Sequence, residues 1–194
     1  MPVLAEPEQD FDELVAIETI PDRYELIDGE IVEVEEMGVY SGEIANILRD
    51  ELSAYGREKK IGRARMDILY PIPTPEDDGR LRRPDVAFAT FERWPENRPV
   101  PYRGNPAEVV PDLAVEVISP TDNGDDIVSK LNEYLRAGVR LVWLIFPNEK
   151  QLYAYTSPRD VRIFTVDQNL DGSDILPGFL VPMATLFPIK ASET

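Results

Sequence analysis

Residues 111–146, PDLAVEVISPTDNGDDIVSKLNEYLRAGVRLVWLIF, decide the fold class of this chain. Within them, residues 112–118 form a mostly apolar run, residues 123–137 repeat apolar side chains at helical spacing, and residues 140–146 form a second apolar run. Such short apolar runs are typical of strands that are buried on both faces. A strand, a helix and a strand joined by short connections predict a right-handed parallel crossover, which is typical of α/β proteins.

The segments before this unit predict a hairpin and two helices. In YELIDGEIVEVEE, two strand-like halves surround a turn at Asp28 and Gly29, which indicates a β-hairpin. Residues 38–56 carry apolar side chains at helical spacing, and Gly56 is expected to end this helix. A shorter helix is expected at residues 11–17.

Further strands complete the expected sheet. They fall in the segments 63–73, 82–91, 150–157 and 159–167, and residues 176–187 are expected to close the fold. The first two are joined by turn-forming residues, and the last two are expected to be antiparallel. The predicted fold class is therefore α/β, with a central mixed sheet flanked by helices. A chain of 194 residues fits a single domain over residues 1–194.

The composition excludes several kinds of chemistry. The chain has no cysteine and no histidine, so disulfides, thiolate ligands and imidazole bases are excluded. No apolar run approaches the ~20 residues that a membrane span needs, and the first residues lack the pattern of a signal peptide. We therefore expect a cytoplasmic protein without membrane contact, whose catalysis would use carboxylates, amines, hydroxyls or a bound cation.

The net charge of −17 opposes a general role in coating nucleic acids, because phosphate binding depends on lysine and arginine. The charge is unevenly distributed, since residues 57–83 hold eight basic and five acidic side chains and thus carry a charge of +3. This stretch predicts either a local basic face on an acidic protein or an ordinary solvated surface.

Glu116 interrupts the apolar strand expected at residues 112–118. Because side chains alternate along a strand, Glu116 shares one face with Ala114 and Ile118. An ionised carboxylate in such surroundings is unfavourable unless it is paired with a positive charge or bound to a cation. Glu116 is therefore expected either to form a salt bridge with an arginine or to bind a cation.

Asp85 and Lys130 favour the cation. Asp85 opens the apolar strand DVAFAT, and two carboxylates that converge from neighbouring strands suit Mg²⁺ or Mn²⁺. Lys130 stands at the margin of an apolar helical stripe that includes Tyr134. Its depth along the helix is ~9 Å at ~1.5 Å per residue. That depth is close to the ~7 Å by which Glu116 precedes the strand end at ~3.3 Å per residue.

Four segments in this order, RYELIDGEIVEV, RRPDVAFAT, PDLAVEVISP and SKLNEYLRAGVRLVWLIFP, resemble the Uma-type restriction endonuclease family, a branch of the PD-(D/E)XK nuclease superfamily. The resemblance implies a restriction-endonuclease-like fold with a core of about residues 24–187. It assigns Asp85, Glu116 and the Val117 backbone carbonyl as metal ligands. It also assigns Lys130 as the catalytic amine beside the attacking water.

Some positions depart from the pattern of these relatives. The wider superfamily places a lysine two residues after the glutamate, where this chain has Ile118, whereas the Uma-type family takes its lysine from the following helix. Members of that family often have a histidine near the position of Ser41. A further acid of the first long helix often completes superfamily sites, here Glu43 or Glu51. Glu25 matches a recurring glutamate and is either an outer participant or an exposed hairpin residue.

These residues together predict an Mg²⁺- or Mn²⁺-dependent endonuclease that hydrolyses phosphodiester bonds in DNA. A homodimer is expected, because the two strands of a duplex suit two sites related by a two-fold axis. The acidic charge and the missing histidine favour an alternative, a catalytically silent nuclease-fold module for binding or regulation. An oligomeric scaffold is a second alternative. Sugar hydrolysis by paired carboxylates ranks last, because only 9% of the residues are aromatic.

Overall fold

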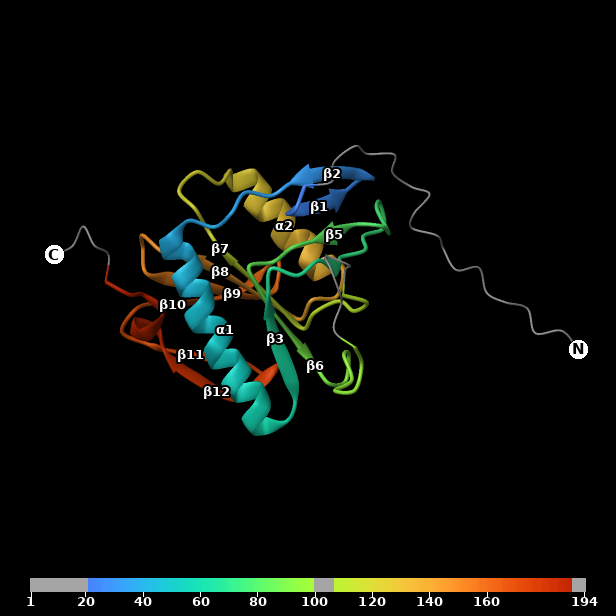
Figure 1. Ribbon diagram of the computed structural model, residues 1–194. Helices are drawn as coiled ribbons and strands as arrows, with labels where there is room; N and C mark the ends of the chain where they lie inside the picture. Colours follow the sequence, from blue (N-terminus) through green and yellow to red (C-terminus); the bar gives the residue numbers. More distant parts are fainter. Residues whose placement is uncertain (1–20, 100–106, 190–194) are drawn as a thin grey trace, which may run out of the picture.

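The computed structural model describes residues 21–99 and 107–189 (Figure 1). The helix expected at residues 11–17 lies outside these described residues. In chain order, the elements are β1 (Tyr24–Ile27), β2 (Glu30–Glu33), α1 (Val39–Lys59), β3 (Gly62–Met66), β4 (Tyr70–Pro71), β5 (Leu81–Arg82), β6 (Val86–Thr90), β7 (Leu113–Val117), α2 (Gly124–Arg136), β8 (Leu141–Phe146), β9 (Gln151–Ser157), β10 (Asp160–Phe164), β11 (Asn169–Gly172), β12 (Leu176–Pro182) and the 3-10 helix η2 (Met183–Leu186).

Six strands form the central sheet in the order β10-β9-β8-β7-β6-β3. Strands β7 and β8 are parallel, with Leu113 opposite Leu141 and Val117 opposite Ile145. The other neighbouring strands of this sheet are antiparallel. The α/β class and the mixed central sheet are therefore confirmed, as is the parallel pair joined through a helix within residues 111–146.

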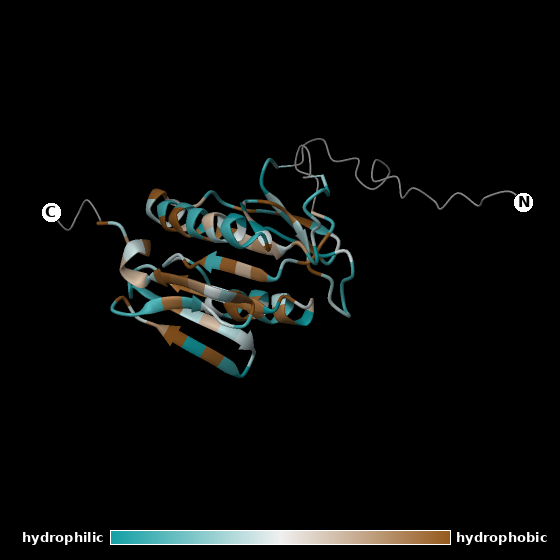
Figure 2. Ribbon diagram, turned by 90° about the horizontal axis from the view of Figure 1, so that it is seen from below, coloured by the Kyte–Doolittle hydropathy of each residue, from teal (hydrophilic) through white to brown (hydrophobic). Residues whose placement is uncertain are grey.

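Helices α1 and α2 lie on opposite sides of the central sheet (Figure 2). Val115 of β7 packs in the same apolar cluster as Leu48 of α1. Its neighbour Ala114 packs in a second cluster with Tyr134 of α2. The side-chain alternation predicted for this strand is thus confirmed. In the part of the chain that the structure describes, no helix combines the length and apolar character that crossing a bilayer requires.

A smaller sheet has the order β2-β1-β5-β4 and lies near α2 (Figure 1). Its first two strands form the predicted hairpin, with Asp28 and Gly29 at φ values of 52° and 79°. Both values lie in the left-handed region that a two-residue hairpin turn requires. Leu26 of β1 pairs with Leu81 of β5. This pairing brings the hairpin beside the chain segment that leads into β6.

The strands expected at residues 63–73 and 82–91 are each divided in two. Their outer parts, β3 and β6, pair in the central sheet, whereas β4 and β5 pair in the smaller sheet. Asp67, with a φ of 54°, lies where the chain leaves one sheet for the other. Strands β9 and β10 pair antiparallel as predicted. The chain then adds β11, which the sequence did not indicate, as the partner of β12.

Gly56 has a different role from the one expected. Helix α1 continues past it and ends at Lys60, which has a φ of 55°. A Cβ atom at Gly56 would lie 2.6 Å from the carbonyl oxygen of Gly62 and 2.9 Å from Cε2 of Phe88. The glycine is therefore needed for close packing of α1 on β3 and β6, and the predicted helix end was wrong.

Replacing Gly56 with alanine is expected to lower the free energy of unfolding by about 1–3 kcal/mol, because the added methyl group overpacks this contact. Gly42 on the same helix is a matched control, since nothing lies within 4 Å of a Cβ there. Gly42→Ala should raise the free energy of unfolding by about 0.5–1 kcal/mol through helix propensity. Urea unfolding measures both variants, and equal gains would contradict the close packing at Gly56.

Candidate active site

Asp85 and Glu116 come from neighbouring strands of the central sheet. Strands β6 and β7 are antiparallel with Val86 opposite Val115. The next position along this register places Asp85 opposite Glu116, on the face that α2 covers. Glu116 is only 8% exposed, and Asp85 is half-buried. The Val117 N–H donates to Asp85 Oδ2 at 2.7 Å, which fixes the carboxylate at the end of β7.

Helix α2 brings two more polar groups to Glu116. Tyr134 donates a hydrogen bond from its hydroxyl to Glu116 Oε1. Lys130 Nζ lies 3.4 Å from the same carboxylate. Lys130 and Tyr134 are four residues apart, so both project from one side of the helix. The structure therefore brings together the strand carboxylate and the helix lysine that the sequence singled out.

Burial governs the protonation of the two strand carboxylates. It raises the pKa of Glu116 to about 7, although the Lys130 ammonium opposes this shift. Burial likewise raises the pKa of Asp85 to about 6, opposed by the hydrogen bond from Val117 and by the charge of Lys130. Both carboxylates are therefore poorly solvated, and an additional positive charge beside them would stabilise their ionised form.

The Lys130 ammonium lies between two acids. Its Nζ is 3.3 Å from Glu25 Oε1 and 3.4 Å from Glu116 Oε1. Burial alone would lower the pKa of Lys130, but Glu116 and Glu25 together hold it above its usual value. Lys130 is thus positively charged at neutral pH and is suited to act as a cation rather than as a base.

Glu25 of β1 is buried beside Lys130 and is not an exposed hairpin residue. Its side chain accepts a hydrogen bond from Arg82 at 2.6 Å and from the Arg83 N–H at 2.9 Å. Burial alone would raise the pKa of Glu25, but the charges of Lys130 and Arg82 lower it below its usual value. Glu25 is therefore a fixed negative charge at the edge of the site.

An ion-pair network holds these elements together. Arg82 Nε donates to Glu133 Oε2 of α2 at 2.7 Å. Arg80 pairs with the same glutamate. It also pairs with Asp77 at 3.1 Å and with Asp28 at 2.8 Å. The two arginines and Glu133 are buried, so the β1–β2 hairpin, β5 and α2 are connected by charges largely shielded from solvent.

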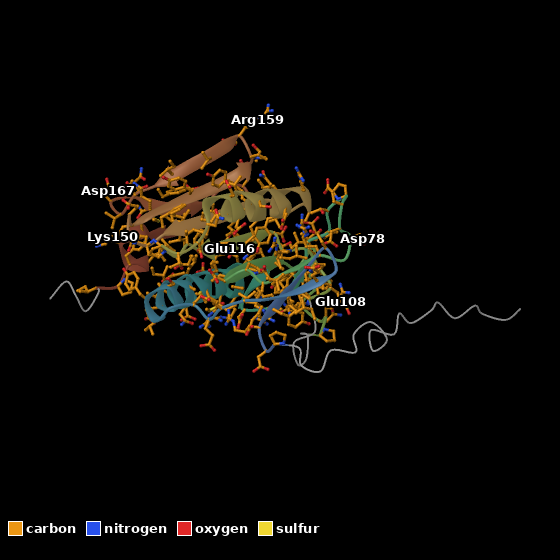
Figure 3. All side chains as sticks on the ribbon, turned by 90° about the horizontal axis from the view of Figure 1, so that it is seen from above. Asp78, Glu108, Glu116, Lys150, Arg159 and Asp167 are labelled. Atoms are coloured by element: carbon orange, nitrogen blue, oxygen red, sulfur yellow. The ribbon has the colours of Figure 1, made fainter. Side chains whose placement is uncertain are left out.

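A cleft of about 1780 Å³ opens beside these groups, lined by residues of β1, β2, α2 and the loops between elements. Figure 3 shows Glu116 in the interior, between the two helices, whereas Asp78 and Arg159 lie toward the outside. Glu43 of α1 lines this cleft. Glu51 is exposed and does not line it. Of the two helix acids that the sequence left open, the structure places only Glu43 near the site.

Acidic side chains dominate the cleft. The basic residues that line it are Arg80, Arg82, Lys130 and Arg136. The acidic ones are Glu25, Asp28, Glu33, Glu35, Glu36, Glu43, Glu76, Asp85, Glu116, Asp122, Asp126 and Glu133. Two of the four basic residues are already buried in ion pairs with these acids. The cleft therefore carries a negative charge of its own.

The basic stretch at residues 57–83 does not form a continuous face beside the site. Its three last arginines, at positions 80, 82 and 83, are buried and paired with acids of this chain. The others belong to the last turn of α1, the turn after it and β3 (Figure 1). That end of α1 is about 30 Å, at 1.5 Å per residue, from the helix start that borders the cleft.

The donor set of the cleft fits a hard divalent cation. Val117 and Tyr134 each occupy one carboxylate oxygen, of Asp85 and Glu116 respectively, and each acid has a second one. Within residues 21–99 and 107–189, no group of three or more acidic, histidine or cysteine side chains is arranged to hold a metal. Two carboxylates nevertheless suit Mg²⁺, which commonly completes its ligands with water and phosphate oxygens.

Sequence reasoning missed three residues that shape this site. It assigned Tyr134 to the apolar stripe of the helix, although its position four residues after Lys130 was a usable signal. Arg82 and Glu133 gave no such signal, because their pairing depends on how β5 docks against α2. Neither local spacing nor periodicity contains that information.

The fold and the facing carboxylates define the class as a nuclease-fold protein, and a solved structure supports this. The crystal structure of "a putative nuclease belonging to DUF820" from Anabaena variabilis ATCC 29413 superimposes with a TM-score of 0.71 and 19% sequence identity. The match covers 84% of this chain and 89% of that one. At this identity the likeness shows the fold alone, and it confirms the predicted fold class. A search of proteins with curated descriptions found no match.

The family follows from the sequence. A model of the Uma2 family, described as "Putative restriction endonuclease", matches residues 9–184. Because the match spans most of the 194 residues, this chain belongs to the Uma2 family. The family resemblance of the four sequence segments is thereby confirmed. Family and fold together support a nuclease.

Replacing Glu133 with alanine is expected to lower the free energy of unfolding by about 3–5 kcal/mol, because Arg80 and Arg82 lose a buried partner. Urea unfolding followed by circular dichroism measures the loss. Arg136→Ala on the same helix is the control, since its pair with Glu76 is exposed and 3.9 Å long. Its effect should not exceed about 0.5 kcal/mol. A similarly small effect at Glu133 would mean that the network does not hold α2 in place.

Proposed function

We propose that this chain is an Mg²⁺- or Mn²⁺-dependent endonuclease that hydrolyses phosphodiester bonds in DNA. The proposal is carried by one observation: Asp85, Glu116 and Lys130, from two strands and a helix, are gathered at one cleft. Membership of the Uma2 family and the nuclease fold support the same reaction. A homodimer would offer one site to each strand of a duplex.

In this proposal, Asp85, Glu116 and the Val117 backbone carbonyl would hold the cation. When bound, the cation would supply a Lewis acid that stabilises negative charge on the scissile phosphate and favours ionisation of a water molecule. The carboxylates would have to be ionised to bind it. The raised pKa values of Asp85 and Glu116 therefore couple metal affinity to pH near neutrality.

Lys130 would act through its charge. The neighbouring acids keep its amine protonated, so it donates hydrogen bonds and does not remove the proton of the attacking water. From its place beside Glu116 it would orient that water or a phosphate oxygen. During hydrolysis the water oxygen bonds to phosphorus, one ester bond to phosphorus breaks, and the leaving oxygen takes up a proton.

A second function, a catalytically silent module for binding or regulation, is favoured by the charge of the cleft. Its lining has many more acidic than basic side chains, and duplex DNA carries about one negative charge per 1.7 Å of its axis. Such a cleft repels DNA unless cations screen it. Binding of Mn²⁺ by the native protein without cleavage of any nucleic acid would favour this second function.

Asp85→Asn is expected to reduce Mn²⁺-dependent cleavage by at least about 100-fold, because the variant loses a proposed metal ligand while keeping the side-chain shape. The assay uses plasmid and single-stranded DNA, and the products are counted on gels. The control is Asp174→Asn, an exposed acid that does not line the cleft. Cleavage that persists unchanged in Asp85→Asn would point to another site or to a contaminating nuclease.

Salt should raise the rate of cleavage, which is opposite to the usual behaviour of proteins that bind DNA through basic surfaces. At saturating Mn²⁺, kcat/KM is expected to increase about two- to tenfold between 0.01 and 0.15 M monovalent salt, as the screening length shortens from about 30 to 8 Å. Initial rates on one oligonucleotide measure this dependence. A steep fall of kcat/KM with salt would show that a basic surface dominates binding.

A further inference from the structure

Two acids of different mobility share the Lys130 ammonium. Its nitrogen is almost equally far from Glu25 Oε1, at 3.3 Å, and from Glu116 Oε1, at 3.4 Å. An ammonium group has three donors on a flexible stem and can remain bound to either acid alone. The position of Lys130 therefore depends on which of the two carboxylates is available.

Glu25 is the acid whose position is fixed. Both of its oxygens are engaged, one by the Arg83 N–H at 2.9 Å and the other by Arg82 at 2.6 Å. Its strand β1 pairs on both sides, with β2 and with β5. Glu25 is 4% exposed, so no open water competes strongly for its carboxylate.

Glu25 is not required merely to neutralise Arg82. The Arg82 guanidinium also binds Glu133 through two of its nitrogens, Nε at 2.7 Å and Nη2 at 2.6 Å. The position of Glu25 between Arg82 and Lys130 therefore calls for an explanation beyond charge balance. The structure provides one in the competition for Glu116.

We propose that Glu25 is a positioning residue that retains the Lys130 ammonium beside the site when a divalent cation occupies Glu116. An ammonium and a divalent cation compete for the same carboxylate. Without Glu25, Lys130 would rest on Glu116 alone and would have to be displaced from the site by the cation. With Glu25, the ammonium keeps one partner and stays within reach of the reacting groups. The proposal rests on the proposed function, since it takes Glu116 as a ligand of the cation.

The first test measures Mn²⁺ binding by titration calorimetry, without any nuclease assay. Glu25→Gln is expected to weaken Mn²⁺ binding about five- to tenfold, because the ammonium is then held by Glu116 alone. In the Lys130→Met background, the same change should have only the small effect of the control Glu30→Gln. That control removes a charge from an exposed position of the same hairpin. Equal effects of Glu25→Gln in both backgrounds would overturn the proposal.

A second measurement needs no metal. Acetylation of Lys130 by an amine-reactive ester, followed by mass spectrometry, reports how well the ammonium is held. Glu25→Gln should accelerate this acetylation severalfold, whereas Glu30→Gln should leave it unchanged. If Glu25→Gln does not fold, Glu25→Asp keeps the charge and withdraws it by one methylene group, and both readouts should shift in the same direction. Unchanged acetylation in the folded variants would overturn the proposal.

The two measurements separate this inference from the nuclease proposal. Native protein that binds no Mn²⁺ and cleaves no DNA would refute the proposed function, and the role of Glu25 in holding Lys130 would then be decided by acetylation alone. Native protein that cleaves DNA while Glu25→Gln lowers kcat and leaves KM unchanged would support both. The kcat loss should disappear in the Lys130→Met background if Glu25 acts through the lysine.

Discussion

Strands β6 and β7 hold Asp85 and Glu116 opposite each other, and neither carboxylate can move far without disturbing the pairing of those strands. The surrounding sheet positions are apolar because α2 covers this face. Two acids in such a position favour protons, a nearby ammonium or a metal cation, since each of these relieves their poor solvation. The other polar groups of the site are arranged around this constraint.

The arginines of this chain serve its architecture more than its surface. Arg80 and Arg82 connect the β1–β2 hairpin and β5 to Glu133 on α2. The same helix carries Lys130, so these pairs determine how closely the lysine approaches Glu116. Buried ion pairs add little net stability, because their desolvation offsets most of their attraction. Their value here lies in fixing the relative position of elements that are distant in sequence.

The sequence was sufficient where a local rule was also the rule of the whole fold. The alternation of residues 112–118 revealed Glu116 as a polar exception, and helical rise placed Lys130 at a similar depth. Both inferences depend only on spacing within one strand–helix unit. The hairpin at Asp28 was equally local, since its turn residues have few conformational alternatives.

It was insufficient where the outcome depends on docking between distant segments. Gly56 was read as a helix end, but its lack of a side chain is explained by Phe88, which follows it by more than thirty residues. Glu25 and Arg82 are both charged residues in short strands, and nothing in their spacing distinguishes a buried pair from two solvated side chains. Burial of a charged residue is decided by its partner, and that partner is supplied by tertiary structure.

The distribution of charge explains how an acidic member of a nuclease family can remain chemically consistent. The basic residues nearest the cleft are taken up by internal pairs, and the free ones are gathered at the far end of α1. A nucleic acid approaching the cleft would therefore meet acids first. Attraction would have to come from cations drawn to those same acids, so metal binding would serve both to assemble the reacting groups and to make the cleft accessible to a polyanion. In such a site the affinity for substrate and the affinity for metal are linked, and a change that weakens one weakens the other.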